Sequence, residues 1–337
     1  MVLNILWFII WGLLWAMYFA LDGFDLGIGI LFPFFAKTDQ DKKAMLESIG
    51  PVWDANEVWL ITAGGATFAA FPITYAYMFS FLYLPLMLIL YGLIIRAVCL
   101  EFRYKVNNPT MISLLEFGFF LGSLLPALLL GVAFGNIFQG LPIDQNGYHG
   151  NLLTLLNPFG LITGILFVVA FLLHGSLWLS FRTEGDINVR AKSIAKKLWF
   201  VTLFFAVLFF VSAYFVTNLY SNYFSMPILL VVPILCVIGL LGAGFFINSS
   251  EIMAFLSSAI CIIFLTFTGV GGLYPNLIPS SINNAFSLSA FNSSSSQYTL
   301  AVMTIVVIIF VPIVLFYKFW TYKTFSYKIK EGKGEGY

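Results

Sequence analysis

Acidic residues inside otherwise apolar segments are the side chains most able to do chemistry in this sequence. The run DGFD (Asp22–Asp25) lies in the first apolar segment, and Asp54 and Glu57 open the second. A charged side chain within a membrane costs about 2.5–3.5 kcal/mol on insertion scales, so its presence there usually has a functional reason. A carboxylic acid in such surroundings can take up and release protons.

The spacing of these acids pairs them on helix faces. Asp22 and Asp25 are three residues apart, as are Asp54 and Glu57, so each pair shares one face of a helix. Two carboxylates in a low dielectric repel each other, which favours the binding of a proton by one of them. We interpret them as a proton inlet with Arg96 as the compensating charge. The alternative is a buried Asp–Arg pair that only fixes helix packing.

The composition places these residues in a membrane protein. Hydrophobic residues make up 61% of the 337 residues and charged residues only 9%, whereas a soluble domain is typically about 25% charged. The long apolar runs lack the alternation of a barrel, so we expect an all-α membrane protein. The first run has no basic leader and no small-residue cleavage site, and we interpret it as a span.

The apolar runs predict about nine transmembrane helices. Their expected ranges are 3–35, 51–71, 75–97, 113–135, 158–181, 198–220, 226–247, 252–275 and 299–321. We expect one transmembrane domain over 1–325, with two four-helix bundles (about 3–135 and 158–275) and one peripheral helix. The first range is too long for a simple crossing, so it either tilts and protrudes or breaks near Gly23, Gly27 and Gly29. Residues 326–337 are expected to form a cytoplasmic tail that frays from 328 onward.

The basic residues predict the orientation. All 16 Lys and Arg end or follow the first, third, fifth and ninth spans. Positive charge marks the cytoplasmic side, so we expect the N-terminus outside and the C-terminus in the cytoplasm of a bacterial inner membrane. Asp22, Asp25, Asp54, Glu57, Arg96 and Glu101 then converge on the cytoplasmic half of the first four helices. Glu116 lies near the start of the fourth span on the same side, and for Glu57 and Glu101 a wet interfacial position is an alternative.

Histidines are too few for a multi-haem protein. Only His149, in an outer loop, and His174, in the fifth span, are present. Haem iron usually needs His or Met axial ligands, so we expect no redox centre and no metal on this chain. His174 is open to three interpretations: a proton relay, polar packing or a partner contact. The three cysteines show no paired spacing and are interpreted as small buried hydrophobes.

Several segments resemble a known family, subunit II of cytochrome bd-type quinol oxidases. The resemblance rests on DGFDLGIG (22–29), PVWDANEVWL (51–60) with ITAGGATFAAFP (61–72), and Arg96 followed by EFR (101–103). It continues with GVAFGNIFQGLP (131–142), LNPFGLITG (156–164) and YPNLIPSS (274–281). The match is looser from 192 to 267, and position 55 is Ala where the family usually has Gly.

The resemblance implies a heterodimer in which subunit I carries two haems b and haem d, oxidises quinol and reduces dioxygen to water. This chain would bind no cofactor, support subunit I and line a proton route from the cytoplasm. Carried onto this sequence, the conduit residues are Asp25, Asp54 and Glu101, with Asp22 and Glu57. Supporting residues are Arg96, Trp59, Asn56 and His174. Lipid, quinone and a small accessory subunit are further expected partners, and nucleic acid is not.

Two rival functions remain at this point. A proton-coupled secondary transporter would also use buried carboxylates and glycine-interrupted helices. An odd span count without a visible inverted repeat counts against it. A scaffold subunit whose acids serve only packing is the second rival, and only mutation separates it from a proton conduit.

Overall fold

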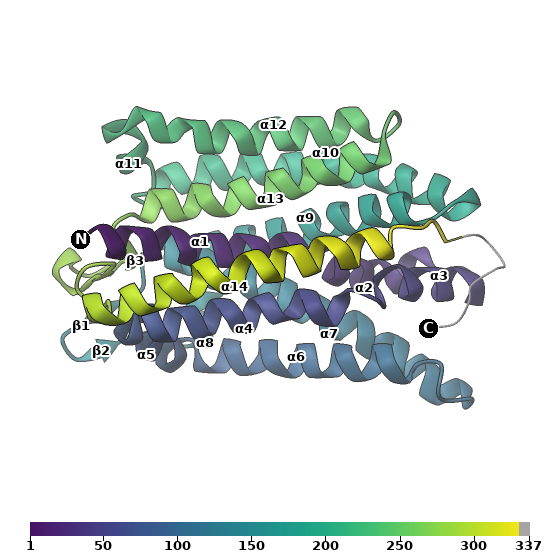
Figure 1. Cartoon of the computed structure of the whole chain (residues 1–337), viewed down its shortest axis with the longest axis horizontal. Coiled ribbons are helices and arrows are strands. Elements are labelled where there is room, and N and C mark those ends of the chain that lie inside the picture. Colours follow the sequence, from purple (N-terminus) through teal and green to yellow (C-terminus); the bar gives the residue numbers. More distant parts are fainter. Residues whose placement is uncertain (330–337) are drawn as a thin grey trace.

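A computed structural model describes residues 1–329, and the helices run roughly parallel along its long axis (Figure 1). The predicted residues 330–337 of the tail, with Lys330 and Lys333, lie outside the described residues. The main helices are α1 (Val2–Leu21), α2 (Gly23–Phe35), α3 (Asp39–Ile49), α4 (Trp53–Ala70), α5 (Pro72–Phe81), α6 (Tyr83–Phe102), α7 (Pro109–Gln139), α9 (Pro158–Arg182), α10 (Gly185–Val216), α12 (Val231–Phe246), α13 (Glu251–Leu273) and α14 (Gln297–Thr324).

The all-α membrane fold is confirmed. Eight helical segments of residues 1–329 are long and apolar enough to cross a membrane, with α1 and α2 acting as one. The predicted second span corresponds to α4, which is less apolar but lies alongside the others in Figure 1. With α4 included, these segments account for the predicted spans.

The clearest differences from the predicted ranges concern the sixth and third spans. The sixth span was expected at 198, but α10 begins at Gly185, because its charged first turns are helical too. The third was expected at 75–97, but a short α5 precedes α6, which continues to Phe102. Pro72 at the first position of α5 suits a helix start, since proline has no N–H to lose there.

Local capping defines several helix starts. The Asn108 side chain accepts hydrogen bonds from the first turn of α7, Asn157 does so for α9, and Ser296 for α14. Thr38 and Asp41 form a capping box at the start of α3. Such caps satisfy N–H groups that have no partner within the helix.

The helices pack as one continuous bundle. α9 contacts α2, α7, α10 and α13, while α1 contacts α4 and α13, α6 contacts α7, and α12 contacts α13. The division into two four-helix bundles stays a prediction. Glycines allow the closest approaches: a Cβ on Gly27 of α2 would lie 1.9 Å from the Phe171 carbonyl oxygen of α9. α14 packs on α1 and α4 and is otherwise exposed.

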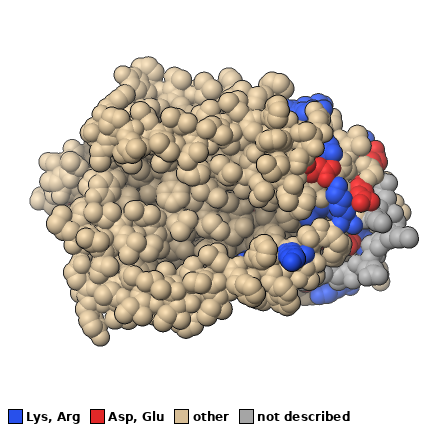
Figure 2. Space-filling model, turned by 45° about the horizontal axis from the view of Figure 1, so that its top comes forward, with Lys and Arg blue, Asp and Glu red and all other residues tan. Residues whose placement is uncertain are grey.

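The two ends of the molecule differ. Charged side chains gather at one end, here named the charged end, where α2 and α3 lie (Figures 1 and 2). The opposite end, named the loop end, holds the N-terminus and the small structured loops. These loops contain β1 (Ile143–Asp144), β2 (Gly147–Tyr148), α8 (Leu152–Leu155), α11 (Tyr220–Ser225), η1 (Pro227–Leu230), β3 (Asn276–Ile278), η2 (Asn284–Phe286) and β4 (Leu288–Ser289).

The loop end is held together by backbone pairing. β1 pairs with β2 and β3 with β4, both antiparallel. Leu141 also bridges Ser280, which joins the two loops predicted to lie outside.

At the charged end, the first residues of the predicted tail are ordered on the bundle. Ile329 is buried, its N–H donates to the Arg182 carbonyl at 2.8 Å, and its own carbonyl accepts from Glu184. Lys328 pairs with Glu251 at 2.6 Å. Residues 328 and 329 were expected to fray and do not, because these contacts fix them.

Candidate functional site

The first span is interrupted where its acids lie. The helix is irregular only at Asp22, between α1 and α2, and backbone hydrogen bonds continue on both sides of it. Both Asp22 and Asp25 are completely buried, with exposed fractions of 0% and 1%. Two acids are therefore held inside the helix bundle, away from water.

Arg96 of α6 is the cation that faces them. Its Nη2 donates to Asp22 Oδ1 at 2.7 Å and lies 3.5 Å from Glu57 Oε2 of α4. The Arg96 and Asp22 side chains are fully enclosed, whereas the Glu57 side chain is 19% exposed. A buried ion pair of this kind is costly to break, because either partner alone is an uncompensated charge.

Asp25 is bound through an amide rather than through a cation. Asn56 Nδ2 of α4 donates to Asp25 Oδ2 at 2.8 Å. Asn56 Oδ1 in turn accepts from the Tyr322 hydroxyl at 2.8 Å and from Lys318 Nζ at 3.3 Å, both on α14. Lys318 also donates to the Ala55 carbonyl. The spans that carry α2, α4, α6 and α14 thus meet in one polar cluster, which we name the acid site: Asp22, Asp25, Asn56, Glu57, Arg96, Lys318 and Tyr322.

Part of this cluster has unused hydrogen-bonding capacity. Among residues 1–329, Asp22 Oδ2, Asp25 Oδ1 and the Nε and Nη1 of Arg96 are buried and have no partner. Buried polar atoms are nearly always paired in folded proteins, with protein or with ordered water. The acid site therefore has the capacity to bind water or an extra proton.

Other predicted residues lie apart from this cluster. Asp54 is exposed in the first turn of α4. Glu101, at the end of α6, has a 40% exposed side chain and lies 3.9 Å from Lys105, with no contact to the acid site among the described residues. Trp59 is buried in the apolar core.

His174 lies in a separate, fully bonded site. Its Nδ1 is 2.6 Å from Ser258 Oγ of α13 and its Nε2 is 2.9 Å from the Ala20 carbonyl of α1. The ring stacks on Phe255 at 4.6 Å. Both ring nitrogens are therefore engaged, and the residue ties α1, α9 and α13 together.

Sequence reasoning missed two members of the acid site, Lys318 and Tyr322. They are four residues apart, so they share one face of α14. That spacing of a cation and a phenol near the end of an apolar span was the available signal. In the sequence, Lys318 counts only as one of the basic residues that flank the ninth span, and Tyr322 is not singled out.

Glu116, expected near the acids, instead belongs to a network at the charged end. It lies 2.8 Å from both Lys42 of α3 and Arg103. Arg103 also pairs with Asp39 at 3.2 Å. These contacts join α3, α7 and the end of α6 outside the acid site.

Asp41 of α3 lies outside the membrane-spanning helices, and its partners are complete. Burial would raise the pKa of Asp41, but hydrogen bonds from Arg190 and from the backbone N–H groups of Lys37 and Thr38 outweigh it. The pKa of Asp41 is therefore held below its usual value of 3.8. The carboxylate links α3 to α10.

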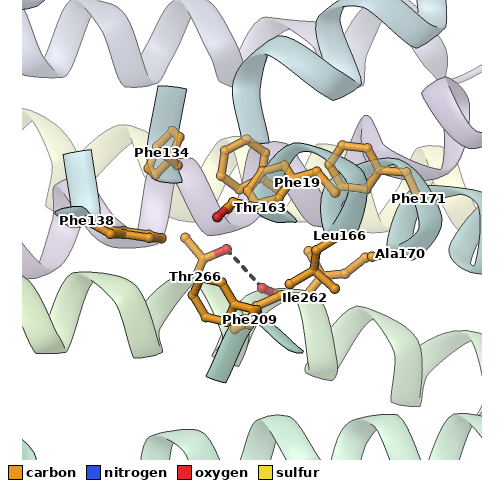
Figure 3. A pocket seen from close by; sticks show the side chains of 12 residues that line it. Phe19, Phe134, Phe138, Thr163, Leu166, Ala170, Phe171, Phe209, Ile262 and Thr266 are labelled. Atoms are coloured by element: carbon orange, nitrogen blue, oxygen red, sulfur yellow. Dashed lines mark hydrogen bonds between the residues drawn. The ribbon is translucent and has the colours of Figure 1, made fainter. Parts of the chain in front are cut away.

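A small apolar cavity lies between α1, α7, α9, α10 and α13 (Figure 3). It is about 20 Å³ in volume and is lined mainly by Phe and Leu side chains, with Thr163 and Thr266. Both hydroxyls donate to carbonyls of their own helices, Phe159 and Ile262. Its wall presents no free polar group for chemistry. Within residues 1–329, moreover, no cluster of three or more metal-ligating side chains exists.

Comparison with known proteins identifies relatives over nearly the whole chain. Residues 3–325 match the family model described as cytochrome bd terminal oxidase subunit II. The "Probable cytochrome oxidase subunit 2" of Haemophilus influenzae is 36% identical over 95% of this chain and 93% of its own.

Two further proteins and one solved structure are similar. The cytochrome bd-I ubiquinol oxidase subunit 2 of Escherichia coli K12 is 35% identical, covering 98% of this chain and 96% of its own. The cytochrome bd ubiquinol oxidase subunit 2 of Bacillus subtilis is 34% identical, with 97% of each covered. A chain of the bd oxidase from Geobacillus thermodenitrificans superposes with a TM-score of 0.79 at 16% identity, over 96% of this chain and 99% of that one.

Proposed function

The chain belongs to the cytochrome bd terminal oxidase subunit II family, and from this premise we propose that it lines a cytoplasmic proton route to the oxygen-reducing site of a quinol oxidase. It is a multi-pass bacterial membrane subunit of a respiratory terminal oxidase. The haems b and haem d belong, in this proposal, to a partner subunit I that this chain stabilises. Quinol, named as ubiquinol for the relatives, is the electron donor of the complex.

The assignment of the haems to the partner is supported by the histidines. His174 uses both ring nitrogens in hydrogen bonds, so neither is free to bind iron. His149 lies in an exposed loop, with its Nε2 2.8 Å from Asp144. In this proposal, therefore, neither histidine of this chain serves as an axial haem ligand.

One observation carries the proton route: fully buried acids with unpaired oxygens at the break in the first span. If Asp22, Asp25 and Glu57 are all ionised, they face two cations, Arg96 and Lys318. One negative charge is then in excess. An uncompensated charge in a low dielectric is expensive, so binding one proton neutralises the site. The cluster can therefore accept a proton and pass it on.

The route would run from the charged end inward. Exposed Asp54 and Glu101 collect protons at the surface, half-buried Glu57 follows one turn into α4, and Asp22 and Asp25 lie at the enclosed end. In this proposal the charged end is cytoplasmic, because the described Lys and Arg residues gather there. Protons for water then enter from inside.

The partner subunit would dock on the face made by α4 and α14. Gly64 and Gly65 of α4 have no atom within 4 Å of where a Cβ would stand. Small residues on an exposed helix face allow another helix to approach closely. α14 beside them exposes large apolar side chains over most of its length. Lipid, quinone and a small accessory subunit are further partners in this proposal.

The test is the variant Asp25→Asn in the purified complex. We expect quinol oxidase turnover to fall by at least about tenfold, since a general proton-transfer group typically contributes a factor of about 10²–10⁴. The reduced-minus-oxidised visible spectrum should keep its haem b and haem d bands, which shows that subunit I is assembled. Normal turnover with an intact spectrum would remove Asp25 from the route.

The same spectrum tests the rival functions. A colourless chain without a second membrane subunit would favour a transporter, which family membership already contradicts. If Asp25→Asn lowers turnover only in proportion to a loss of the haem bands, the result would instead support a scaffold subunit whose acids serve helix packing.

A further inference from the structure

The outermost helix, α14, carries a polar face that points into the molecule. From Ile308 to Trp320 nearly every side chain is exposed and apolar. Lys318 and Tyr322 are half-buried instead, and Thr321 is buried. Thr321 and Tyr322 follow Lys318 by three and four positions, so all three lie on the same side of the helix. An exposed apolar helix thus turns a cation and a phenol toward α4.

This face contacts a single side chain of the acid site, Asn56. Its Oδ1 accepts from the Tyr322 hydroxyl at 2.8 Å and from Lys318 Nζ at 3.3 Å, while its Nδ2 donates to Asp25 at 2.8 Å. An amide has one oxygen and one NH₂ group. Two donors on the α14 side therefore require the oxygen to face α14 and the NH₂ to face Asp25.

Helix capping does not explain the position of Lys318. Its ammonium lies against Ala55 and Asn56, in the first turn of α4. That turn is the positive end of the helix dipole, where a cation is unfavourable. The Asn56 amide that Lys318 contacts donates to Asp25, so the cation lies one side chain away from a buried acid. The acid site, rather than the helix end, accounts for a cation here.

We propose that Lys318 and Tyr322 are positioning residues of the acid site, and that α14 orients Asp25 through the Asn56 amide. The inference rests on the proposed function, in which Asp25 conducts protons. With α14 in place, the amide NH₂ is directed at the carboxyl group. Without its two donors, Asn56 is free to turn its oxygen toward Asp25, and two acceptors then face each other.

The charges around Asp25 come from few elements. Tyr18 and Asp22 precede it on the first span, Glu57 comes from α4, Arg96 from α6, and Lys318 and Tyr322 from α14. α7 and α9 also pack on α2, but their Glu116 and His174 are bonded to other groups. Loss of the Lys318 charge removes one of the two cations near Asp25.

The experiment measures quinol oxidase turnover of the purified complex between about pH 5.5 and about pH 9, a range in which perturbed acids titrate. Lys318→Met removes the cation, Lys318→Arg keeps it, and Tyr322→Phe deletes one hydroxyl oxygen. Lys323→Met, on an exposed residue of the same helix, is the matched control. The haem bands report assembly in every variant.

We expect Lys318→Met to lower turnover by about three- to tenfold and to move the pH profile to higher pH by about one unit, because a cation favours the ionised form of a nearby carboxyl group. Lys318→Arg should restore both. Tyr322→Phe should lower turnover by about twofold, and Lys323→Met should change nothing.

Three outcomes would overturn the inference. The first is that Lys318→Met and Tyr322→Phe both keep the wild-type turnover and pH profile while Asp25→Asn is slow. In that case α14 would have no role in the acid site, although the proposed proton route would still hold. A slow Lys318→Met with an unshifted profile and no rescue by Arg would show a packing role only. The third applies if the complex with Lys318→Met does not assemble. In that case, wild-type turnover of Tyr322→Phe would contradict the proposal. Normal turnover of Asp25→Asn would instead refute the route itself.

Discussion

Two buried polar sites adjoin the first span and involve different neighbours. His174 of α9 bonds to the Ala20 carbonyl and to Ser258 of α13, whereas Arg96 of α6 bonds to Asp22. The His174 site has every ring nitrogen paired, whereas the acid site leaves carboxylate oxygens and guanidinium nitrogens unpaired among residues 1–329.

This difference in hydrogen bonding suggests that the two groups of buried polar side chains have different roles. A polar group whose bonds are all satisfied by protein stabilises helix packing and has no capacity for a further partner. A group with bonds to spare can bind water or a proton, but it destabilises the fold unless its charge is compensated. We therefore expect substitutions at His174 to change stability alone, and substitutions in the acid site to change both stability and turnover.

The largest effect is expected at Arg96. Arg96→Leu leaves Asp22 buried without a counter-charge, and breaking a buried pair in this way costs about 3–5 kcal/mol. The yield of assembled, haem-containing complex should fall steeply, as measured by visible absorption of the purified membranes. The double variant Asp22→Asn with Arg96→Leu is the control and should recover part of the yield. Equal loss in both would mean that Arg96 acts mainly through another partner, such as Glu57.

At His174, the expected effect is on stability only. His174→Phe removes both hydrogen bonds and should lower the free energy of unfolding by about 1–3 kcal/mol, seen as a lower thermal midpoint. Turnover per haem and its pH profile should match the wild type. A fall in turnover at an unchanged thermal midpoint would make His174 a proton relay and would break the distinction between the two sites.

Asp41, at the charged end, is a second site whose hydrogen bonds are satisfied by protein. Its contribution to the stability of the fold should depend on pH. The pKa of Asp41 is lowered on folding, so its stabilising contribution is complete above the unfolded value of about 3.9 and is lost as pH falls through the lower folded value. Asp41→Asn should cost about 1 kcal/mol at neutral pH, a typical value for a lost cap. The difference in thermal midpoint should disappear toward about pH 3. A constant difference down to that pH would contradict the assignment.

The smallest effect is expected at Glu101. Its exposed carboxylate pairs only loosely with Lys105, and such pairs contribute about 0–1 kcal/mol. Glu101→Gln should leave stability unchanged and turnover within about twofold, because water at the surface can replace it as a proton donor. A loss as large as that of Asp25→Asn would show that surface exposure does not exclude a residue from the essential part of the route.

Much of the fold followed from the sequence, because span positions depend on apolar length and that signal is local. The convergence of Asp22, Asp25, Glu57 and Arg96 followed from topology alone. Glu101 was placed less well: five residues rotate a helix by about 140° past a full turn, so it cannot share the face of Arg96. Arg103, seven residues on, does return to that face, but it contacts Glu116 instead.

The contribution of α14 could not be predicted in the same way. Asn56 and Lys318 are 262 residues apart in the chain, and their contact depends on how the last span packs against α4. Hydropathy predicts that this span exists, but it does not predict which face of the helix points toward α4. Rotation is decided by side-chain contacts that a single sequence does not reveal.

The distance along the chain between partners also sets an order of events during synthesis. Asp22 enters the membrane with the first span, 74 residues before Arg96 is made, and Lys318 follows only with α14. The first span is therefore expensive to insert until α6 follows it, and the amide that faces Asp25 is fixed only once α14 is in place. A chain stopped before α14 would carry its acids without the two donors that orient Asn56.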